Sequence, residues 1–226
     1  MAESVVDIWN LALSAAGGRG GITSETDKGR EVDLCRMHFP QVRDVIMKAS
    51  SWPCSSAYAL LALTATRGTA SWTVNDPAPE WTYAYAEPSD MLAPRYLTSY
   101  GRFTRSRFRG TSHIMCNEPQ AILHYSARET DVANWDTGLK QAVIYGLAAA
   151  ITYPLSGKFS AARDNRELAT EAIMLSRTEI ANESDEQYKA LPQWIAARGY
   201  EQRPTQTPFF WPYETFSVLG LTNASS

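Results

Sequence analysis

The sequence predicts an α+β fold, mainly α: a four-helix bundle formed by N- and C-terminal helix pairs, with a small antiparallel β insert and an extended C-terminal tail. Three observations predict it. Apolar residues recur at helical spacing near both ends of the chain, strand-like alternation with turn residues fills the middle, and aromatic residues among prolines follow the last helix. We therefore expect the bundle at residues 1–52 and 130–190, the β-rich insert at 53–129, and a short helix with an aromatic tail for partner docking at 191–226.

Two helices are expected before residue 52. Ser4 can cap the first, and the glycine-rich stretch at 17–21 ends it. The second runs from about residue 23 to 49, and Pro40 should kink or break it, because proline removes a backbone hydrogen bond. Its apolar residues recur every three or four positions, at Val32, Cys35, Phe39, Val42, Ile46 and Ala49.

Strand signals occupy the middle of the chain. Trp81, Tyr83 and Tyr85 alternate with smaller residues, so we expect one face of a strand to carry three aromatic rings before a turn at 88–90. Further strands are expected at 57–64, 112–116 and 121–127, the last two joined by a hairpin turn.

Two more helices are expected after residue 130. The third begins at Asn134 or Asp136, and Gly146 on its apolar stripe would let another helix approach closely. The fourth, at 160–182, is more polar, and we expect it to pack through Leu168, Ala172 and Leu175. The stripe of the third helix comprises Leu139, Ala142, Val143, Gly146, Leu147, Ala150, Ile151 and Pro154.

Composition restricts the class of protein. The formal net charge of −3 argues against a general polyanion binder. Cys35, Cys54 and Cys116 cannot all pair within one chain and match no metal-binding spacing, which favours a reducing compartment. No signal-peptide pattern and no apolar run of membrane-spanning length is present, so we expect no membrane contact and synthesis in a cytoplasm.

No stretch of the sequence carries a catalytic pattern. The glycines at 17–21 lack the Gly-Lys-Ser/Thr of a phosphate-binding loop and follow a helix rather than a strand. There is no Gly-x-Ser-x-Gly elbow, and the glutamate pairs at i,i+4 are typical of a solvated helix face. We therefore expect no catalytic, cofactor or metal residues and no enzyme.

One stretch is strongly basic, with four arginines in eight residues and phenylalanines between them. Guanidinium groups pair with phosphates and aromatic rings stack on bases, so nucleic acid or an acidic partner could bind here. A solvated strand edge and a salt-bridged subunit contact remain the alternatives. The arginines are Arg102, Arg105, Arg107 and Arg109.

The C-terminal segment from Pro204 is the strongest interaction signal. Its prolines exclude a helix, yet its aromatic residues are too apolar to remain free in water. We expect it to dock on a partner or a neighbouring copy, the alternative being that it covers the chain's own helices. The candidate docking residues are Trp194, Phe209, Phe210, Trp211, Tyr213 and Phe216.

Several short motifs occur in a fixed order along residues 4–199. They are Asn10-Leu-Ala-Leu13, Cys35-x-x-x-Phe39-Pro40-x-x-Arg43-Asp44, Trp52, Tyr83-x-Tyr85-x-x-Pro88-Ser-Asp90, Ile122-x-x-Tyr125, Trp135-Asp136, the alanine-rich stretch at 142–151, and Trp194-Ile-x-x-Arg198. In this order they resemble the tail tubular protein A family, the head-to-tail adaptor of short-tailed bacteriophages. The chain departs from the family pattern at 67–79, at 102–109 and after residue 199.

The resemblance implies a structural virion protein. It implies a homo-oligomeric ring, typically a dodecamer, between the portal protein and the tail nozzle protein, with genomic DNA passing transiently through its channel. The alternatives are a nucleic-acid-binding module that uses the arginine run, and a polysaccharide hydrolase.

Overall fold

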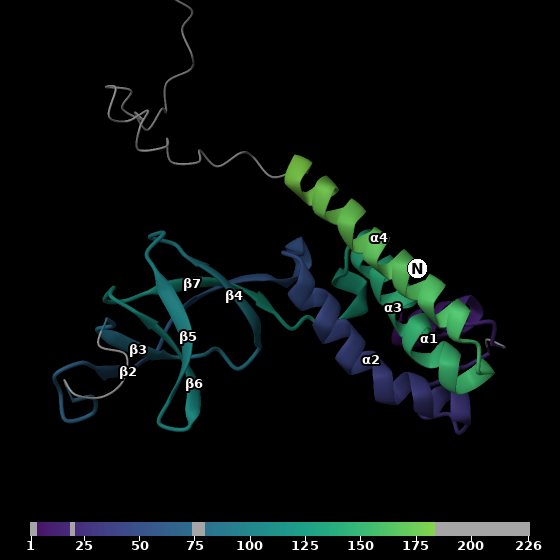
Figure 1. Ribbon diagram of the computed structural model, residues 1–226, viewed down its shortest axis with the longest axis horizontal. Helices are drawn as coiled ribbons and strands as arrows, with labels where there is room; N and C mark the ends of the chain where they lie inside the picture. Colours follow the sequence, from purple (N-terminus) through teal and green to yellow (C-terminus); the bar gives the residue numbers. More distant parts are fainter. Residues whose placement is uncertain (1–3, 19–20, 74–79, 184–226) are drawn as a thin grey trace, which may run out of the picture. The chain divides into compact units, whose positions relative to one another are not determined.

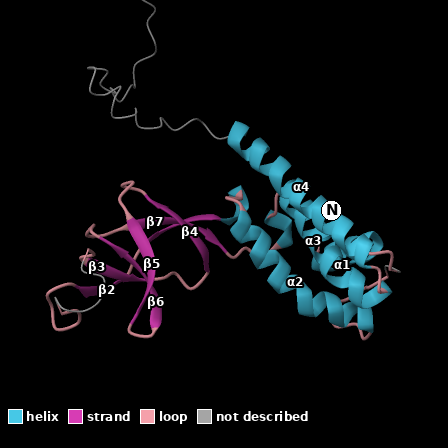
Figure 2. Cartoon of the chain, in the orientation of Figure 1, coloured by secondary structure: helices cyan, strands magenta, loops and turns pink. Residues whose placement is uncertain are grey.

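The computed structural model describes residues 4–18, 21–73 and 80–183, and the structural statements below concern these residues (Figure 1). They form four α-helices and seven strands, and the strands lie in two antiparallel sheets (Figure 2). The predicted four-helix bundle with a small β insert is therefore wrong. The chain has a mixed α/β fold in which two antiparallel sheets of seven strands accompany the four helices.

The first two helices are α1, Val5–Ala15, and α2, Arg30–Ala49. Ser4 caps α1 as expected, in a capping box with Asp7. The carboxylate of Asp27 accepts hydrogen bonds from the backbone N–H groups of residues 23 and 24, so a separate turn precedes α2 and delays its start. Of the kink or break expected at Pro40, the break does not occur, since α2 continues through this residue.

The other two helices are α3, Thr137–Ser156, and α4, Phe159–Glu183. Helix α3 packs against α1, α2 and α4. A Cβ atom added to Gly146 would lie 2.8 Å from Cδ1 of Ile46 and 3.0 Å from Cγ1 of Val42. This confirms that Gly146 permits close approach, here of α2.

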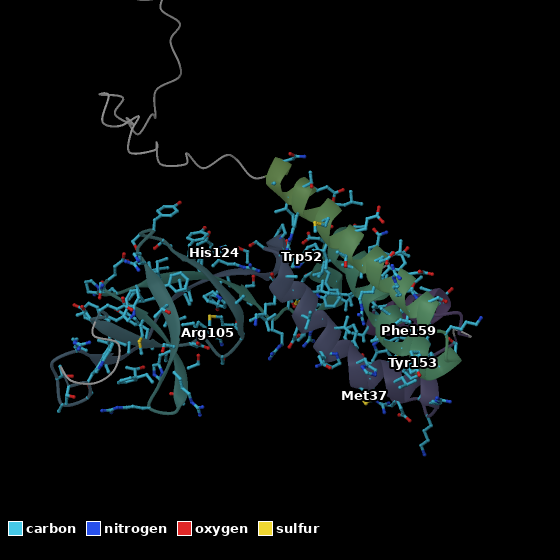
Figure 3. The ribbon with its side chains drawn as sticks, viewed as in Figure 1. Met37, Trp52, Arg105, His124, Tyr153 and Phe159 are labelled. Atoms are coloured by element: carbon cyan, nitrogen blue, oxygen red, sulfur yellow. The ribbon has the colours of Figure 1, made fainter. Side chains whose placement is uncertain are left out.

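One cluster of buried side chains joins the four helices. The rings of Trp9, Phe39 and Trp135 meet inside it, with centroids about 6 Å apart. Trp52, which follows α2, is fully buried in the same cluster, and its indole N–H donates to the carbonyl of Ile46 at 3.0 Å (Figure 3). Trp52 therefore fixes the end of α2 to the common core.

The first sheet has three strands in the order β1-β7-β4. A short 3-10 turn, Pro53–Ser55, leads into β1. Another, Val132–Asn134, follows β7 and precedes α3. The strands are β1, Ser56–Leu60; β7, Ile122–Ala127; and β4, Met91–Leu97.

The second sheet has four strands in the order β2-β3-β6-β5. Four connections pass from one sheet to the other, namely those from β1 to β2, β3 to β4, β4 to β5 and β6 to β7. The strands are β2, Leu63–Thr66; β3, Tyr83–Ala86; β6, Thr111–Cys116; and β5, Phe103–Phe108.

Three features made the β region look smaller in the sequence than it is. The single strand expected at 57–64 is two strands of different sheets, β1 and β2. Strand β4 contains Pro94, a residue that argues against a strand unless it lies at an edge. Strand β5 coincides with the arginine run and has no clear apolar alternation.

The two sheets share a core. Tyr85 and Ile114 of the second sheet pack with Leu97, Leu123 and Tyr125 of the first. A separate buried cluster, which includes Trp72, Trp81 and Phe108, packs with Ala84 and Met115. Because Trp81 joins this second cluster while Tyr85 joins the first, the expected face of three aromatic rings is wrong, and only Tyr83 and Tyr85 are neighbours, 6.2 Å apart.

Arginine side chains connect the sheets to α2. Arg95 on β4 donates to the carbonyl oxygens of Lys48 and Ser50 at the end of that helix. Arg128, just after β7, forms an ion pair with Asp44 at 2.9 Å. Strands that follow α2 by more than 40 residues thus satisfy its last carbonyl groups.

Candidate interaction surfaces

The six aromatic residues predicted to dock on a partner lie outside the described residues. This applies to Trp194, Phe209, Phe210, Trp211, Tyr213 and Phe216. Their docking role stays a prediction.

The arginine run lies on and beside β5, an outer strand of the second sheet. Arg105 is engaged there: its Nε and Nη2 atoms donate to the two carboxylate oxygens of Glu87, each at 2.6 Å (Figure 3). Such a two-point pair fixes both side chains and neutralises one positive charge of the run.

Glu87 is ionised in this setting. Burial acts to raise the pKa of the Glu87 carboxyl, but hydrogen bonds from Arg105 and Ser112 outweigh burial and lower it. The Arg105–Glu87 pair is therefore complete at neutral pH.

The other three arginines form no ion pair with a described residue. Arg107 donates to the carbonyl oxygen of Gly110 at 3.1 Å. The guanidinium of Arg109 lies 5.4 Å from the centre of the Phe108 ring, and Arg102 is exposed just before β5. The structure thus leaves a basic strand edge with one of its four charges neutralised.

Helix α4 exposes its leucines, which is the reverse of the expectation. Of the residues expected to pack, only Ala172 is buried, while 41% of Leu168 and 59% of Leu175 is exposed. The buried residues of α4 are small or polar, namely Asn165, Ala169, Ala172 and Ser176, while Ile173 and Ile180 are partly buried against the helical core. Phe159 and Met174 are exposed as well, so α4 presents several large apolar side chains to solvent.

A close fit between α3 and α4 explains this reversal. A Cβ atom added to Gly138 of α3 would lie 1.9 Å from Oγ and 2.9 Å from Cβ of Ser176. Asn165 donates to the hydroxyl of Thr152 and to the carbonyl of Ala15. Helices this close have no room for leucine between them, so the leucines of α4 face outward.

The three-stranded sheet has an outer face, on the side opposite Leu123 and Tyr125. On it, His124 of β7 lies between Tyr58 of β1 and Tyr96 of β4, with ring centroids 4.6 and 4.5 Å away. The two tyrosine hydroxyls share a hydrogen bond of 3.1 Å. A neighbouring row on this face contains Leu60 and Ile122, both exposed.

His124, which is labelled in Figure 3, is buried against the rings of Tyr58 and Tyr96. Its Nε2 atom forms a hydrogen bond of 2.7 Å with the hydroxyl of Ser56, and its Nδ1 atom has no partner among the described residues. Burial lowers the pKa of His124, and the nearby charge of Arg95 lowers it further. The hydrogen bond with Tyr58 raises the pKa of Tyr96 to about 12, so Tyr96 is uncharged at neutral pH.

Sequence reasoning did not single out Tyr58, Leu60 or His124. The available signal was the alternation of large and small residues at 56–60, which the single strand expected at 57–64 already contained. The sequence does not show that Tyr58 and Leu60 face solvent, because this depends on which face of the first sheet the second sheet covers.

Among the described residues, the sites to consider for catalysis are the cysteines, the lining of one cavity and the potential metal ligands. Burial raises the pKa of Cys35 and of Cys54 to about 11, so both remain thiols at neutral pH. A cavity of about 770 Å³ lies between the start of α2 and Leu155, but its Asp27 is held in a turn, where backbone hydrogen bonds from Thr23 and Ser24 lower its pKa. No cluster of three potential metal ligands occurs among residues 4–18, 21–73 and 80–183.

None of the described helices is both long and apolar enough to cross a bilayer. Comparisons with known protein families and with curated proteins found no match for this chain. Its function must therefore be argued from its own residues.

Proposed function

We propose that this chain is a subunit of a head-to-tail adaptor ring of a short-tailed bacteriophage. In this role it joins the portal to the tail nozzle and forms part of the channel for DNA ejection in the virion. The observation that carries the proposal is the outward orientation of the leucines of α4. Leu168 and Leu175 are seven residues apart and therefore share one face of α4, and apolar residues grouped on an exposed face mark interaction sites.

A ring requires two different contact surfaces on every copy, because each subunit meets its neighbours head to tail. The chain offers two sets of exposed apolar residues on separate elements. One is on α4, with Leu168 and Leu175, and the other is on the three-stranded sheet, with Tyr58 and Leu60. This supports assembly through unlike surfaces.

The basic edge of β5 fits a channel through which DNA moves. Tight phosphate binding would oppose movement, and each neutralised phosphate contact adds to affinity. The pairing of Arg105 with Glu87 moderates the charge of the run. The motifs shared with the tail tubular protein A family add support, because they are spread over both the helices and the strands.

Negative-stain electron microscopy and analytical ultracentrifugation of the purified full chain, with and without portal rings, test the proposal. We expect closed rings that attach to the portal, and loss of rings in the Leu168→Ser/Leu175→Ser variant. Thr170→Ser, a change at an exposed polar site of the same helix, serves as the control and should leave assembly unchanged. A chain that stays monomeric at every concentration, and also beside portal rings, would contradict the proposal.

Nucleic-acid binding is a second candidate, favoured by the three arginines that form no ion pair with a described residue. It predicts binding of short DNA that weakens with salt and is lost when Arg102, Arg107 and Arg109 are replaced by serine. No binding at low salt would exclude it.

A further inference from the structure

The two sheets have four edge strands, and three of them carry features that discourage pairing with another strand. Natural proteins protect sheet edges with charged residues, prolines and irregular register. Strand β4 contains Pro94, Arg95 and register shifts; β5 contains Arg105 and Arg107; and β2 has a register shift. Strand β1, with the sequence Ser-Ala-Tyr-Ala-Leu, has a regular register and no charge or proline.

The backbone groups of β1 that face away from β7 can be assigned. The N–H of Leu61 donates to the carbonyl of Ala121 at 2.9 Å. Since residues of an antiparallel pair alternate between bonded and non-bonded, Ser56, Tyr58 and Leu60 direct their backbone groups away from β7. On that side the N–H of Ser56 donates to the carbonyl of Pro53, and no described residue forms a backbone hydrogen bond there with Tyr58 or Leu60.

The side chains of these same residues are also exposed. Of Tyr58, 59% is accessible to solvent, and of Leu60, 67%. At Tyr58 and Leu60 the edge therefore offers free backbone groups next to apolar side chains, and β1 carries no charged residue. A matching strand would be uncharged and would carry aromatic or branched side chains on one face.

The chain itself contains a segment with these properties, residues 204–213. It has no charged residue between Arg203 and Glu214. Its prolines, Pro204, Pro208 and Pro212, all occupy even positions. In an extended strand, successive residues direct their N–H groups to opposite edges, so all three prolines share one edge and the other edge keeps every donor.

The residues on the proline-free edge suit a strand. They are the odd-numbered Thr205, Thr207, Phe209, Trp211 and Tyr213, all residue types enriched in β-strands. A segment with prolines on both edges could not add to a sheet at all. The even spacing of the prolines leaves one edge competent for pairing and blocks the other, which prevents further growth.

We propose that β1 accepts residues 204–213 of a neighbouring copy as an added antiparallel strand. The inference rests on the proposed function, of which it names one subunit contact. In antiparallel pairing the odd-numbered side chains lie opposite Ser56, Tyr58 and Leu60, so the aromatic residues of the added segment extend the row that Tyr58 begins. The contact joins unlike surfaces, as a ring requires.

A synthetic peptide of residues 203–216 tests the pairing. The receptor is the full chain with Phe209, Trp211 and Tyr213 replaced by serine, so that its own segment does not compete. Binding is followed by fluorescence anisotropy of the labelled peptide. N-methylation of Phe209 and Trp211 should weaken binding by about tenfold or more, because it blocks donors that face β1, whereas N-methylation of Gln206 and Phe210 should change it by less than about twofold.

A second arm changes the receptor instead of the peptide. Leu60→Ser should weaken peptide binding by roughly tenfold. Leu63→Ser is the matched control, because Leu63 on β2 is 55% exposed and should leave binding unchanged. Absence of peptide binding, or equal losses from odd and even N-methylation, would overturn the proposal.

The outcomes separate this inference from the proposed function. Rings that attach to portal without any peptide binding to β1 would refute the strand contact and leave the adaptor role standing. Peptide binding at β1 in a chain that never forms rings would refute the adaptor role and keep the contact.

Discussion

The helical part and the sheet part of this protein expose different chemical groups. Helices satisfy their backbone hydrogen bonds internally, so α4 can meet a partner only through side chains such as Leu168 and Leu175. Sheets leave backbone groups free at their edges, so β1 can be met through its main chain as well. The comparison indicates that this protein can bind partners in two ways, through side chains on α4 and through the main chain of β1. A ring in which each subunit uses two different surfaces needs two such contacts.

The cores of the two parts also differ. One continuous cluster holds the four helices together, whereas the strands are held by two clusters, of which one lies between the sheets. A defect in the helical core should therefore reach every helix, and a defect in a sheet cluster should stay more local.

The largest expected effect is that of Trp52→Ala. Trp52 is fully buried among the helices and donates to Ile46, so its removal leaves a cavity and an unpaired carbonyl. We expect the free energy of unfolding to fall by about 3–5 kcal/mol. Denaturant unfolding followed by circular dichroism measures it.

Leu175→Ala is the control for Trp52→Ala, because Leu175 is exposed on α4. It should change the free energy of unfolding by less than about 0.5 kcal/mol. A loss below about 1 kcal/mol for Trp52→Ala would show that the helical core is not continuous through this residue.

A smaller effect is expected from Gly138→Ala, which tests the close approach of α3 and α4. The added Cβ would lie 2.9 Å from Cβ of Ser176, so one helix must shift. We expect a loss of about 1–3 kcal/mol in the free energy of unfolding. Gly29→Ala, at a position with no atom within 4 Å of the added Cβ, should be nearly neutral in the same assay.

The smallest effect is a pH dependence that we place in the sheet part. Burial lowers the folded-state pKa of His124 below its ordinary value of 6.5, with help from Arg95. The neutral ring therefore favours the folded state: its contribution is complete above pH 6.5 and is lost as pH falls through the lowered pKa. Between about pH 7.5 and pH 5, the wild type should lose about 1 kcal/mol more than His124→Gln.

His38→Gln on α2 controls for the loss of an imidazole elsewhere in the chain. Equal pH slopes for wild type and His124→Gln would locate the titration outside the sheet part.

Much of the helical part could be predicted from local sequence. The Ser4 cap and the apolar stripe of α3 lie within a few residues of the structure they produce, and helical hydrogen bonds are local as well. Pro40 was expected to kink or break α2, and it does not break it: the helix runs through Pro40 and packs on α3. The strands were harder, since their partners lie far away in the chain.

Two features at the candidate contacts were settled only by tertiary structure. The period of α4 shows where its leucines lie on the helix, but the close fit at Gly138 and Ser176 decides that they face solvent. The alternation at 56–60 shows a strand, but pairing with β7 on one side only makes β1 an edge.

The sequence by itself determined the helices, several strands, the arginine run and the even spacing of the prolines after residue 203, because each depends on residues close together in the chain. The tertiary structure alone decided which apolar faces were covered, which strand edge stayed open, and that Arg105 is neutralised by Glu87. Those outcomes depend on contacts between segments that are many residues apart, and the local pattern of residues along the chain does not specify such contacts.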